Sequence, residues 1–119
     1  MNEEITVEEL REMPQGEYLL IDVRDSAAFA LGHIDGAVNV VPGQLGEAQL
    51  PKDKPVVVCC RSGIISDEIA AQLRENGYQA ANLAGGYVRW LGQKIALQSS
   101  ADRAAEIERS ITKKFHRSI

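Results

Sequence analysis

The stretch Pro55-Val56-Val57-Val58-Cys59-Cys60-Arg61-Ser62-Gly63 predicts the fold more strongly than any other part of the chain. Three consecutive valines bounded by turn residues are typical of a strand buried on both faces, as in a parallel sheet. A helix is expected from Ser66, with Ile69 and Leu73 on one face. Residues 60–65 would then form a loop at the carboxyl end of the strand, where open α/β sheets bind their ligands.

Strands and helices alternate on both sides of this stretch. Thr6 and Glu9 form a capping-box pattern, which predicts a short helix to about Glu12. Asp25 or Ser26 is expected to cap a second helix. Further strands are expected at 18–21, 37–40 and 79–83, with a single helical turn after Pro42, a helix stop at Gly32 and another helix start at 87–91. The pattern predicts an α/β fold, with a parallel sheet of about five strands and helices on both faces.

The chain of 119 residues holds two cysteines, Cys59 and Cys60, and they are adjacent. Neighbouring strand residues point to opposite faces, so this pair suits neither a disulfide nor a zinc site. A buried Cys59 and a reactive Cys60 thiol in a reducing compartment are expected instead. There is no apolar run of the ~20 residues that span a bilayer, and the N-terminus lacks the pattern of a signal peptide. We therefore expect a cytoplasmic protein.

The surroundings of Cys60 favour a thiolate. The cysteine precedes a helix, whose N-terminal N–H groups and dipole stabilise negative charge. Arg61 adds a cation, and Gly63 allows the loop to curl into an anion-binding nest. Asp67 and Glu68 oppose a negative sulfur nearby. The balance predicts a nucleophilic Cys60.

Four motifs together resemble the successive motifs of single-domain rhodaneses. They are Leu20-Ile21-Asp22-Val23-Arg24-Asp25, Gly32-His33-Ile34-Asp35-Gly36-Ala37-Val38-Asn39, Val57-Val58-Cys59-Cys60-Arg61-Ser62-Gly63 and Asn82-Leu83-Ala84-Gly85-Gly86-Tyr87-Val88-Arg89-Trp90. The resemblance covers roughly residues 4–95 and implies a rhodanese-like fold.

The resemblance also implies a function. Cys60 would be the catalytic residue of a sulfurtransferase, carrying sulfane sulfur as a persulfide from thiosulfate or a protein persulfide donor to a thiol or protein acceptor. No metal and no organic cofactor would be needed. The active-site loop would comprise Arg61, Ser62, Gly63, Ile64, Ile65 and Ser66, whose backbone N–H groups would stabilise the persulfide. Asp22 and Arg24 would support the neighbouring loops, and His33 would have a structural role.

One departure from the family pattern affects the substrate. Ile65 stands where many family loops carry an arginine, which makes use of a small dianion such as thiosulfate less certain than persulfide chemistry. Ile65 also lies at helical spacing from Ile69 and Leu73, so it is alternatively an extension of that helix's apolar face. A non-catalytic regulatory or protein-interaction module with the same fold is the alternative function. The related phosphatases and arsenate reductases need an arginine at the position of Ser66, which disfavours that class.

The C-terminal segment differs from the rest in charge. Residues 1–100 hold 8 Lys and Arg against 14 Asp and Glu, whereas residues 101–119 hold 5 against 3. We therefore predict a domain at 1–98 and a basic amphipathic helical tail at 99–119, whose apolar stripe comprises Ala104, Ile107, Ile111 and Phe115. The tail either packs back on the domain or links it to a further domain.

The segment 107–115 is similar to the one that precedes the ATP-binding domain in some tRNA 2-thiocytidine-type thiolases of the PP-loop family. That resemblance implies a fused or partner ATP-dependent tRNA thiolase and a role in tRNA thiolation. Arg109, Lys113, Lys114 and Arg117 would then lie near a region that handles RNA phosphate.

Overall fold

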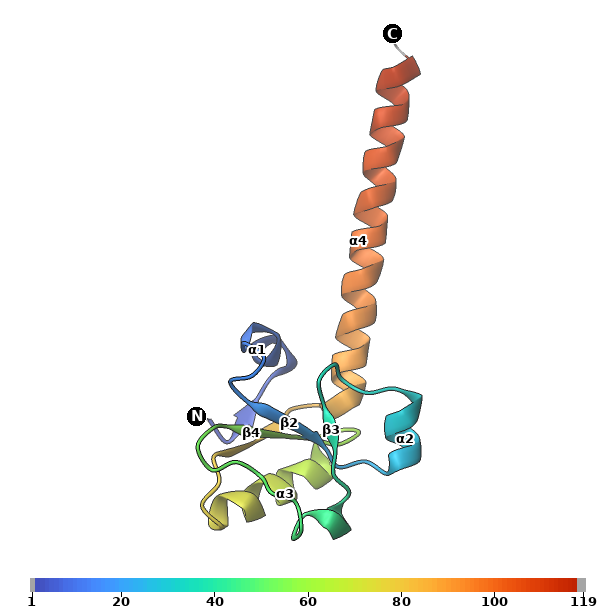
Figure 1. Ribbon diagram of the computed structural model, residues 1–119. Helices are drawn as coiled ribbons and strands as arrows, with labels where there is room; N and C mark the ends of the chain where they lie inside the picture. The colour runs from blue at the N-terminus through green and yellow to red at the C-terminus, as the bar shows by residue number, and fades with distance from the viewer. Residues whose placement is uncertain (1, 118–119) are drawn as a thin grey trace.

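The computed structural model describes the backbone of residues 2–117 and the side chains of residues 2–112. Its centre is a five-stranded sheet in the order β1-β5-β4-β2-β3, with every neighbouring pair parallel (Figure 1). The strands are β1 Glu4–Ile5, β2 Leu19–Asp22, β3 Val38–Asn39, β4 Val56–Cys59 and β5 Ala80–Leu83. The predicted α/β fold with a five-stranded parallel sheet is confirmed.

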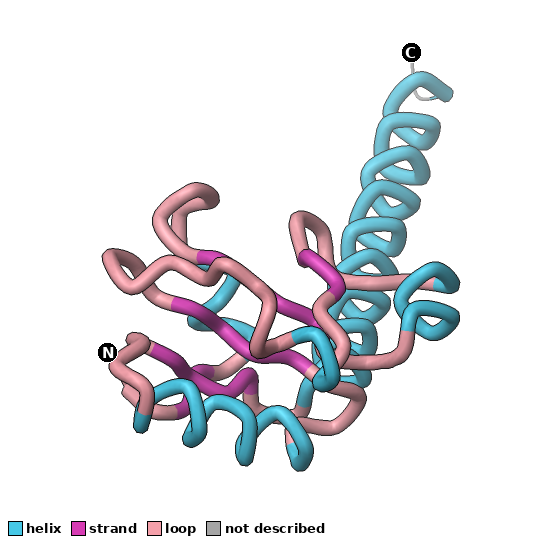
Figure 2. Tube along the Cα trace, turned by 60° about the horizontal axis from the view of Figure 1, so that its bottom comes forward, coloured by secondary structure: helices cyan, strands magenta, loops and turns pink. Residues whose placement is uncertain are grey.

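Helices cover both faces of this sheet. They are α1 Val7–Glu12, α2 Ser26–Leu31, the 3₁₀ turn η1 Pro42–Gln44, α3 Ile64–Glu75 and α4 Gly86–Arg117. Helix α1 and the base of α4 lie on one face and α3 lies on the other, while α2 sits at the β3 end (Figures 1 and 2). Burial on both faces explains why all four residues of β4 are inaccessible to solvent.

The predicted helix caps are present. Thr6 accepts a hydrogen bond from the Glu9 backbone N–H and Glu9 accepts one from the Thr6 N–H, which is the predicted capping box. Asp25, rather than Ser26, caps α2 by accepting from the Ala28 N–H at 2.8 Å. Local side-chain chemistry is therefore enough to place these two helix starts.

The start of α3 and the presence of strand β1 differ from the sequence-based expectation. Helix α3 begins at Ile64, two residues before the predicted Ser66, because Gly63 adopts the left-handed conformation at φ +92° and serves as the N-cap. Strand β1 was not expected. It has only two residues and forms because the chain before α1 pairs with β5, through Glu4 opposite Asn82 and Ile5 opposite Leu83.

Alternation along β4 divides its side chains between two cores. Val57 and Cys59 belong to the cluster under α1 and α4, which also contains Leu83 and Trp90. The other cluster lies under α3 and holds the remaining β4 valines, Val56 and Val58, together with Cys60, Ile69, Ala70 and Leu73. The two adjacent cysteines therefore lie on opposite faces of the sheet, as the strand geometry predicts.

Helix α4 extends away from the body of the molecule. It is a continuous helix of 32 residues, and Figure 1 shows its C-terminal part without neighbours. Ile107 and Ile111 are 56% and 49% exposed, so the tail does not pack back on the domain. The predicted boundary after residue 98 falls inside this helix and stays a prediction. The side chains of Lys113, Lys114, Phe115 and Arg117, and the whole of Ile119, lie outside what the structure describes. Within the described part, no helix has the length and apolar character to cross a membrane.

Candidate active site

Cys60 lies directly after β4, in a loop held between two helices. Helix α4 closes the loop from one side, since the Tyr87 N–H donates to the Cys60 carbonyl at 2.9 Å and the Val88 N–H to the Arg61 carbonyl at 3.0 Å. Gly86 permits this approach: its φ is +59°, and a Cβ there would lie 2.5 Å from the Cys60 carbonyl oxygen. The base of α4 therefore fixes the backbone from which the Cys60 side chain projects.

Three possible hydrogen-bond donors at the start of α3 lie within reach of the Cys60 sulfur. The Gly63 N–H donates at 3.1 Å, the Ser66 N–H at 3.4 Å and the Ser66 hydroxyl at 3.1 Å. Cys60 is only 5% exposed, so water contributes little to its solvation. The loop partly forms the predicted nest, with the bonds coming from two N–H groups and one hydroxyl.

These contacts decide the ionisation of Cys60. Burial alone would raise the pKa of the thiol, but the Ser66 hydroxyl and the backbone N–H groups of Ser66, Gly63 and Ser62 outweigh it, so the net effect lowers the pKa of Cys60 below its usual value of 9.0. The thiolate is the nucleophilic form of cysteine. The arrangement therefore suits Cys60 to attack an electrophilic sulfur.

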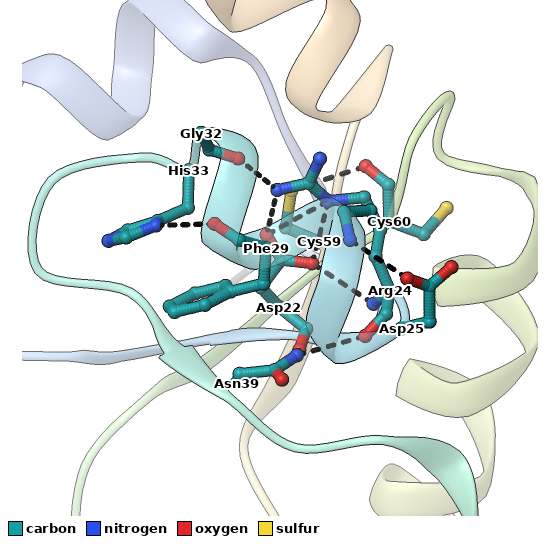
Figure 3. A network of polar contacts seen from close by, with 10 residues as sticks. Asp22, Arg24, Asp25, Phe29, Gly32, His33, Asn39, Cys59 and Cys60 are labelled. Atoms are coloured by element: carbon teal, nitrogen blue, oxygen red, sulfur yellow. Dashed lines mark hydrogen bonds and ion pairs between the residues drawn. The ribbon is translucent and has the colours of Figure 1, made fainter.

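Cys59 has the opposite environment. Its side chain is fully buried, and burial, followed by the charge of Asp22, raises the pKa of Cys59 to about 12. Its thiol donates to the Cys60 carbonyl at 3.3 Å. Figure 3 shows the two sulfur atoms directed apart. Cys59 is thus a buried strand residue in the position that the sequence predicted.

Asp22 and Arg24 form an ion pair at the same edge of the sheet (Figure 3). The Arg24 Nη2 lies 2.7 Å from the Asp22 Oδ2 and also donates to the Gly32 carbonyl at 2.7 Å. The guanidinium lies 4.1 Å from the centroid of the Tyr87 ring. Since Asp22 is fully buried, the pair ties β2 to the end of α2 and to α4. This geometry fits a supporting role for both residues.

The second motif packs beside this ion pair. The Asn39 Nδ2 donates to the carbonyls of Asp22 and Arg24 at 3.0 and 2.9 Å. The ring of His33 stacks on Phe29 at 3.8 Å, and its Nδ1 lies 2.8 Å from the Phe29 carbonyl oxygen. The contacts of His33 join it to α2, in keeping with a structural role.

The outer side of the loop is exposed. Arg61, Ser62, Asp67 and Glu68 all reach solvent. Ile64 and Ile65, in the first turn of α3, are 73% and 59% exposed, whereas Ile69 and Leu73 are buried. Ile65 therefore does not extend the buried face of α3, as its spacing had allowed. Among the residues that the structure describes, no three His, Cys, Asp or Glu side chains are placed to hold a metal ion.

Two side-chain roles at the site are not predicted by the sequence motifs. Ser66 is expected from the sequence to contribute only its backbone N–H. In the structure its side-chain hydroxyl also contacts Cys60 and Asn82. Asn82 was not considered as a site residue, yet it is 97% buried beside the loop, with 3% of its surface exposed. A signal was available, because Asn82 is the one polar residue in the otherwise apolar strand Ala80–Leu83.

Comparison with known families agrees with this geometry. The model of the rhodanese-like domain matches residues 6–93, which is most of the chain and includes the whole site. The chain belongs to the rhodanese-like domain family. The rhodanese-like fold and the family recognised from the four motifs are confirmed.

Several relatives of this rhodanese-like domain are named sulfurtransferases. It is 40% identical over 101 residues to the thiosulfate sulfurtransferase GlpE of Actinobacillus succinogenes, which covers 82% of this chain and 91% of that protein. It superposes on the human single-domain sulfurtransferase TSTD1 with a TM-score of 0.68 at 29% identity, covering 77% of this chain and 97% of that one. The domain is therefore of the rhodanese sulfurtransferase type.

Other relatives are much longer than this rhodanese-like domain. The chain is 40% identical over 97 residues to the probable adenylyltransferase/sulfurtransferase MoeZ of Mycobacterium tuberculosis, matching 75% of this chain but only 24% of that protein. It is 36% identical over 83 residues to the tRNA sulfurtransferase of Desulfurococcus amylolyticus, matching 70% of this chain and 17% of that protein. Rhodanese-like domains of this kind thus occur both alone and as parts of larger proteins.

Proposed function

We propose that the chain transfers sulfane sulfur through a persulfide on Cys60, from thiosulfate or a persulfide-bearing protein to a thiol acceptor. The observation that carries this proposal is the set of three donor groups that face the Cys60 sulfur, at 3.1, 3.4 and 3.1 Å. They stabilise a thiolate, and they come from a loop whose outer side is open to solvent. A non-catalytic module would have no need of donors that converge on the sulfur.

The reaction has two displacements. In the first, the Cys60 thiolate attacks the outer sulfur of the donor R–S–SH, the S–S bond of the donor breaks, and R–S⁻ leaves with the bonding pair. With thiosulfate the leaving group is sulfite. In the second, an acceptor thiolate attacks the terminal sulfur of the Cys60 persulfide, which forms the acceptor persulfide and regenerates the Cys60 thiolate. Dividing the transfer into two steps is covalent catalysis, and the donors at the loop stabilise the negative sulfur in both.

Mass spectrometry tests this function directly. After incubation with thiosulfate or a protein persulfide, the intact chain should gain the mass of one sulfur atom, and peptide mapping should place it on Cys60. The Cys60→Ser variant should gain nothing, and the matched Cys59→Ser variant should load normally. An unmodified wild-type chain with both donors would favour the non-catalytic alternative.

We further propose that the part of α4 beyond residue 98 connects the domain to a region that handles tRNA, in a cytoplasmic setting. The exposed Ile107 and Ile111 support a connecting role, because apolar side chains on a projecting helix gain stability only from a partner surface. The relative named tRNA sulfurtransferase, of whose length this chain matches 17%, supports the proposal that the connected region handles tRNA. An ATP-dependent thiolase, fused or separate, would then receive the sulfur.

Truncation tests the domain boundary. A chain ending at Gln98 should fold and still load sulfur on Cys60, because every contact described around the sulfur comes from residues before that point. Circular dichroism would report folding, and mass spectrometry would report loading. Loss of folding on truncation would show that the tail belongs to the domain. Binding of tRNA to the full chain should be weak and should fall further with added salt.

A further inference from the structure

A buried amide lies behind the active-site loop. Asn82 is in β5, next to the central strand β4, where it pairs with Val58, and only 3% of its surface is exposed. Its Nδ2 donates to the Gly63 carbonyl at 3.0 Å, and its Oδ1 lies 2.6 Å from the Ser66 hydroxyl oxygen. Burying an amide costs free energy unless both ends are bonded. Asn82 therefore depends on two residues, Gly63 and Ser66, that also contact the Cys60 sulfur, and the Ser66 hydroxyl is the group that makes both contacts.

The orientation of this amide follows from its partners. A backbone carbonyl oxygen can only accept, so the end of Asn82 that faces Gly63 must be the NH₂ group. The carbonyl end then faces Ser66, and it too can only accept. The contact of 2.6 Å between Asn82 and Ser66 is a hydrogen bond only when Ser66 donates its single hydroxyl proton to the amide.

Ser66 therefore faces two acceptors with one proton. Its hydroxyl oxygen lies 3.1 Å from the Cys60 sulfur as well as 2.6 Å from the Asn82 oxygen. With a Cys60 thiol, every group is satisfied: the S–H donates to Ser66 and the Ser66 O–H donates to Asn82. With a thiolate, the O–H must either turn to the sulfur and leave the amide oxygen unpaired, or stay on Asn82 and leave the sulfur without that donor.

We propose that Asn82 is a positioning residue for sulfur transfer: its amide oxygen competes with the Cys60 sulfur for the Ser66 proton. Asn82 thus restrains the ionisation of Cys60, while its NH₂ group holds the Gly63 end of the loop. The consequence for sulfur transfer rests on the proposed function. The competition itself concerns only the Cys60 thiol and is measurable without any sulfur donor.

The charged groups on the surrounding elements stay the same in the variants below. They are Asp22, Arg24 and Asp25 around the start of α2, Arg61 in the loop, Asp67 and Glu68 on α3 and Arg89 on α4. The Cys59 thiol lies on the other face of the sheet. A difference between wild type and the uncharged Asn82→Leu variant therefore reports the Ser66 proton rather than a change in neighbouring charge.

Alkylation of Cys60 by iodoacetamide as a function of pH tests the proposal, with peptide mapping to separate Cys60 from Cys59. The Asn82→Leu variant removes the competing acceptor at similar volume. Its alkylation midpoint should move to lower pH, with roughly three- to tenfold faster reaction below the wild-type midpoint, because the hydroxyl is free to donate to a charged sulfur. In the Ser66→Ala background the same substitution should give no such acceleration.

The Asn82→Asp variant should shift the pH midpoint of Cys60 alkylation in the opposite direction. A carboxylate accepts the Ser66 proton more strongly and adds negative charge, so the midpoint should move to higher pH and the reaction should slow. A purely structural Asn82 would loosen the loop in both variants and shift both midpoints upward. An unchanged or raised midpoint in folded Asn82→Leu, or an equal acceleration with Ser66→Ala, would overturn the proposal. Circular dichroism establishes folding, and Asn82→Ala, which also removes the amide oxygen and should also move the midpoint to lower pH, keeps the test decisive if Asn82→Leu does not fold.

Discussion

Cys59 and Cys60 are neighbours in the chain and face opposite sides of the same sheet. The Cys59 side belongs to the apolar cluster under α1 and α4, where burial raises the pKa of the thiol to about 12. The Cys60 side meets the start of α3, where donors lower the pKa of the thiol despite burial. The comparison teaches that burial alone does not determine cysteine reactivity. Donors aimed at the sulfur decide it.

The largest expected effect is selective alkylation of the two cysteines. At pH 7 a thiol with a pKa near 12 is ionised to about one part in 10⁵, so iodoacetamide should label Cys60 at least about a thousandfold faster than Cys59 in the folded chain. Peptide mapping over time would measure both rates. In concentrated urea the rates should converge. Comparable labelling of both cysteines in the folded chain would refute the division between the two faces.

A cation added at Ile65, on the exposed side of the active-site loop, should have the next largest effect. Ile65 is 59% exposed, so Ile65→Arg can be accommodated without repacking and would supply a cation at the position where many family loops carry an arginine. A charge-assisted contact contributes roughly 1.5–3 kcal/mol, so turnover of thiosulfate should rise about ten- to a hundredfold. The gain should shrink as salt is added.

Two controls make this change specific. Ile64→Arg adds the same charge one residue away, and Ile65→Gln adds polarity without charge. If Ile64→Arg raises thiosulfate turnover as much as Ile65→Arg does, the effect is general electrostatic attraction and the position has no special role. Turnover of a protein persulfide should respond less, because that donor is not a small dianion.

Helix α4 holds the backbone of Cys60 and Arg61, and a substitution at Gly86 should disrupt this contact. A Cβ at this position would lie 2.5 and 2.7 Å from the carbonyl oxygens of Cys60 and Arg61, at a φ of +59° that disfavours alanine. Gly86→Ala should lower the free energy of unfolding by about 2 kcal/mol and reduce sulfur loading on Cys60. Urea denaturation and mass spectrometry would measure the two effects.

Gly92 is the matched control in the same helix. Nothing lies within 4 Å of a Cβ added there, so Gly92→Ala should raise stability by about 0.5–1 kcal/mol through helix propensity. Its sulfur loading should equal that of the wild type. Equal behaviour of the two alanine variants would mean that the close approach at Gly86 does not hold the loop.

A smaller effect than that of Gly86→Ala is expected in the pH dependence of stability. The pKa of Cys59 is raised in the folded state, so its contribution is fully present below the unfolded value of 9.0 and is lost as pH rises towards about 12. Wild type should therefore lose about 1.4 kcal/mol relative to Cys59→Val on going from neutral pH to pH 10. The measurement is urea denaturation of both chains under reducing conditions.

The Cys60 thiol should change the stability of the fold with pH in the opposite direction. Its pKa is lowered in the folded state, so its contribution to stability is present above pH 9.0 and is lost as pH falls through the folded value. The stability of wild type relative to Cys60→Ser should increase as pH rises towards 9. Parallel curves for the two cysteines would contradict the contrast between the faces.

Local sequence patterns are enough to identify Cys60 as the reactive cysteine. Strand alternation at Val57, Val58 and Cys59 separates the two thiols, and this period is a local property of the backbone. Local caps likewise placed the starts of α1 and α2, and the four motifs identified the family. These signals could be read directly because the partners in each lie within a few residues of one another.

The groups around the Cys60 sulfur, in contrast, come from segments that are distant in the sequence. The Ser66 hydroxyl meets Asn82 across 16 residues, and Asn82 meets Gly63 across 19. Strand β1 formed because of a partner 78 positions away, since Glu4 lies opposite Asn82. The sequence predicts a helix start at 87–91 and a separate helical tail at 99–119, whereas α4 is one continuous helix. Contacts between distant segments depend on how the sheet orders its strands, and no local pattern encodes that order. The sequence therefore identified Cys60, and the packing of β5 and α3 behind it identified the groups that control its proton.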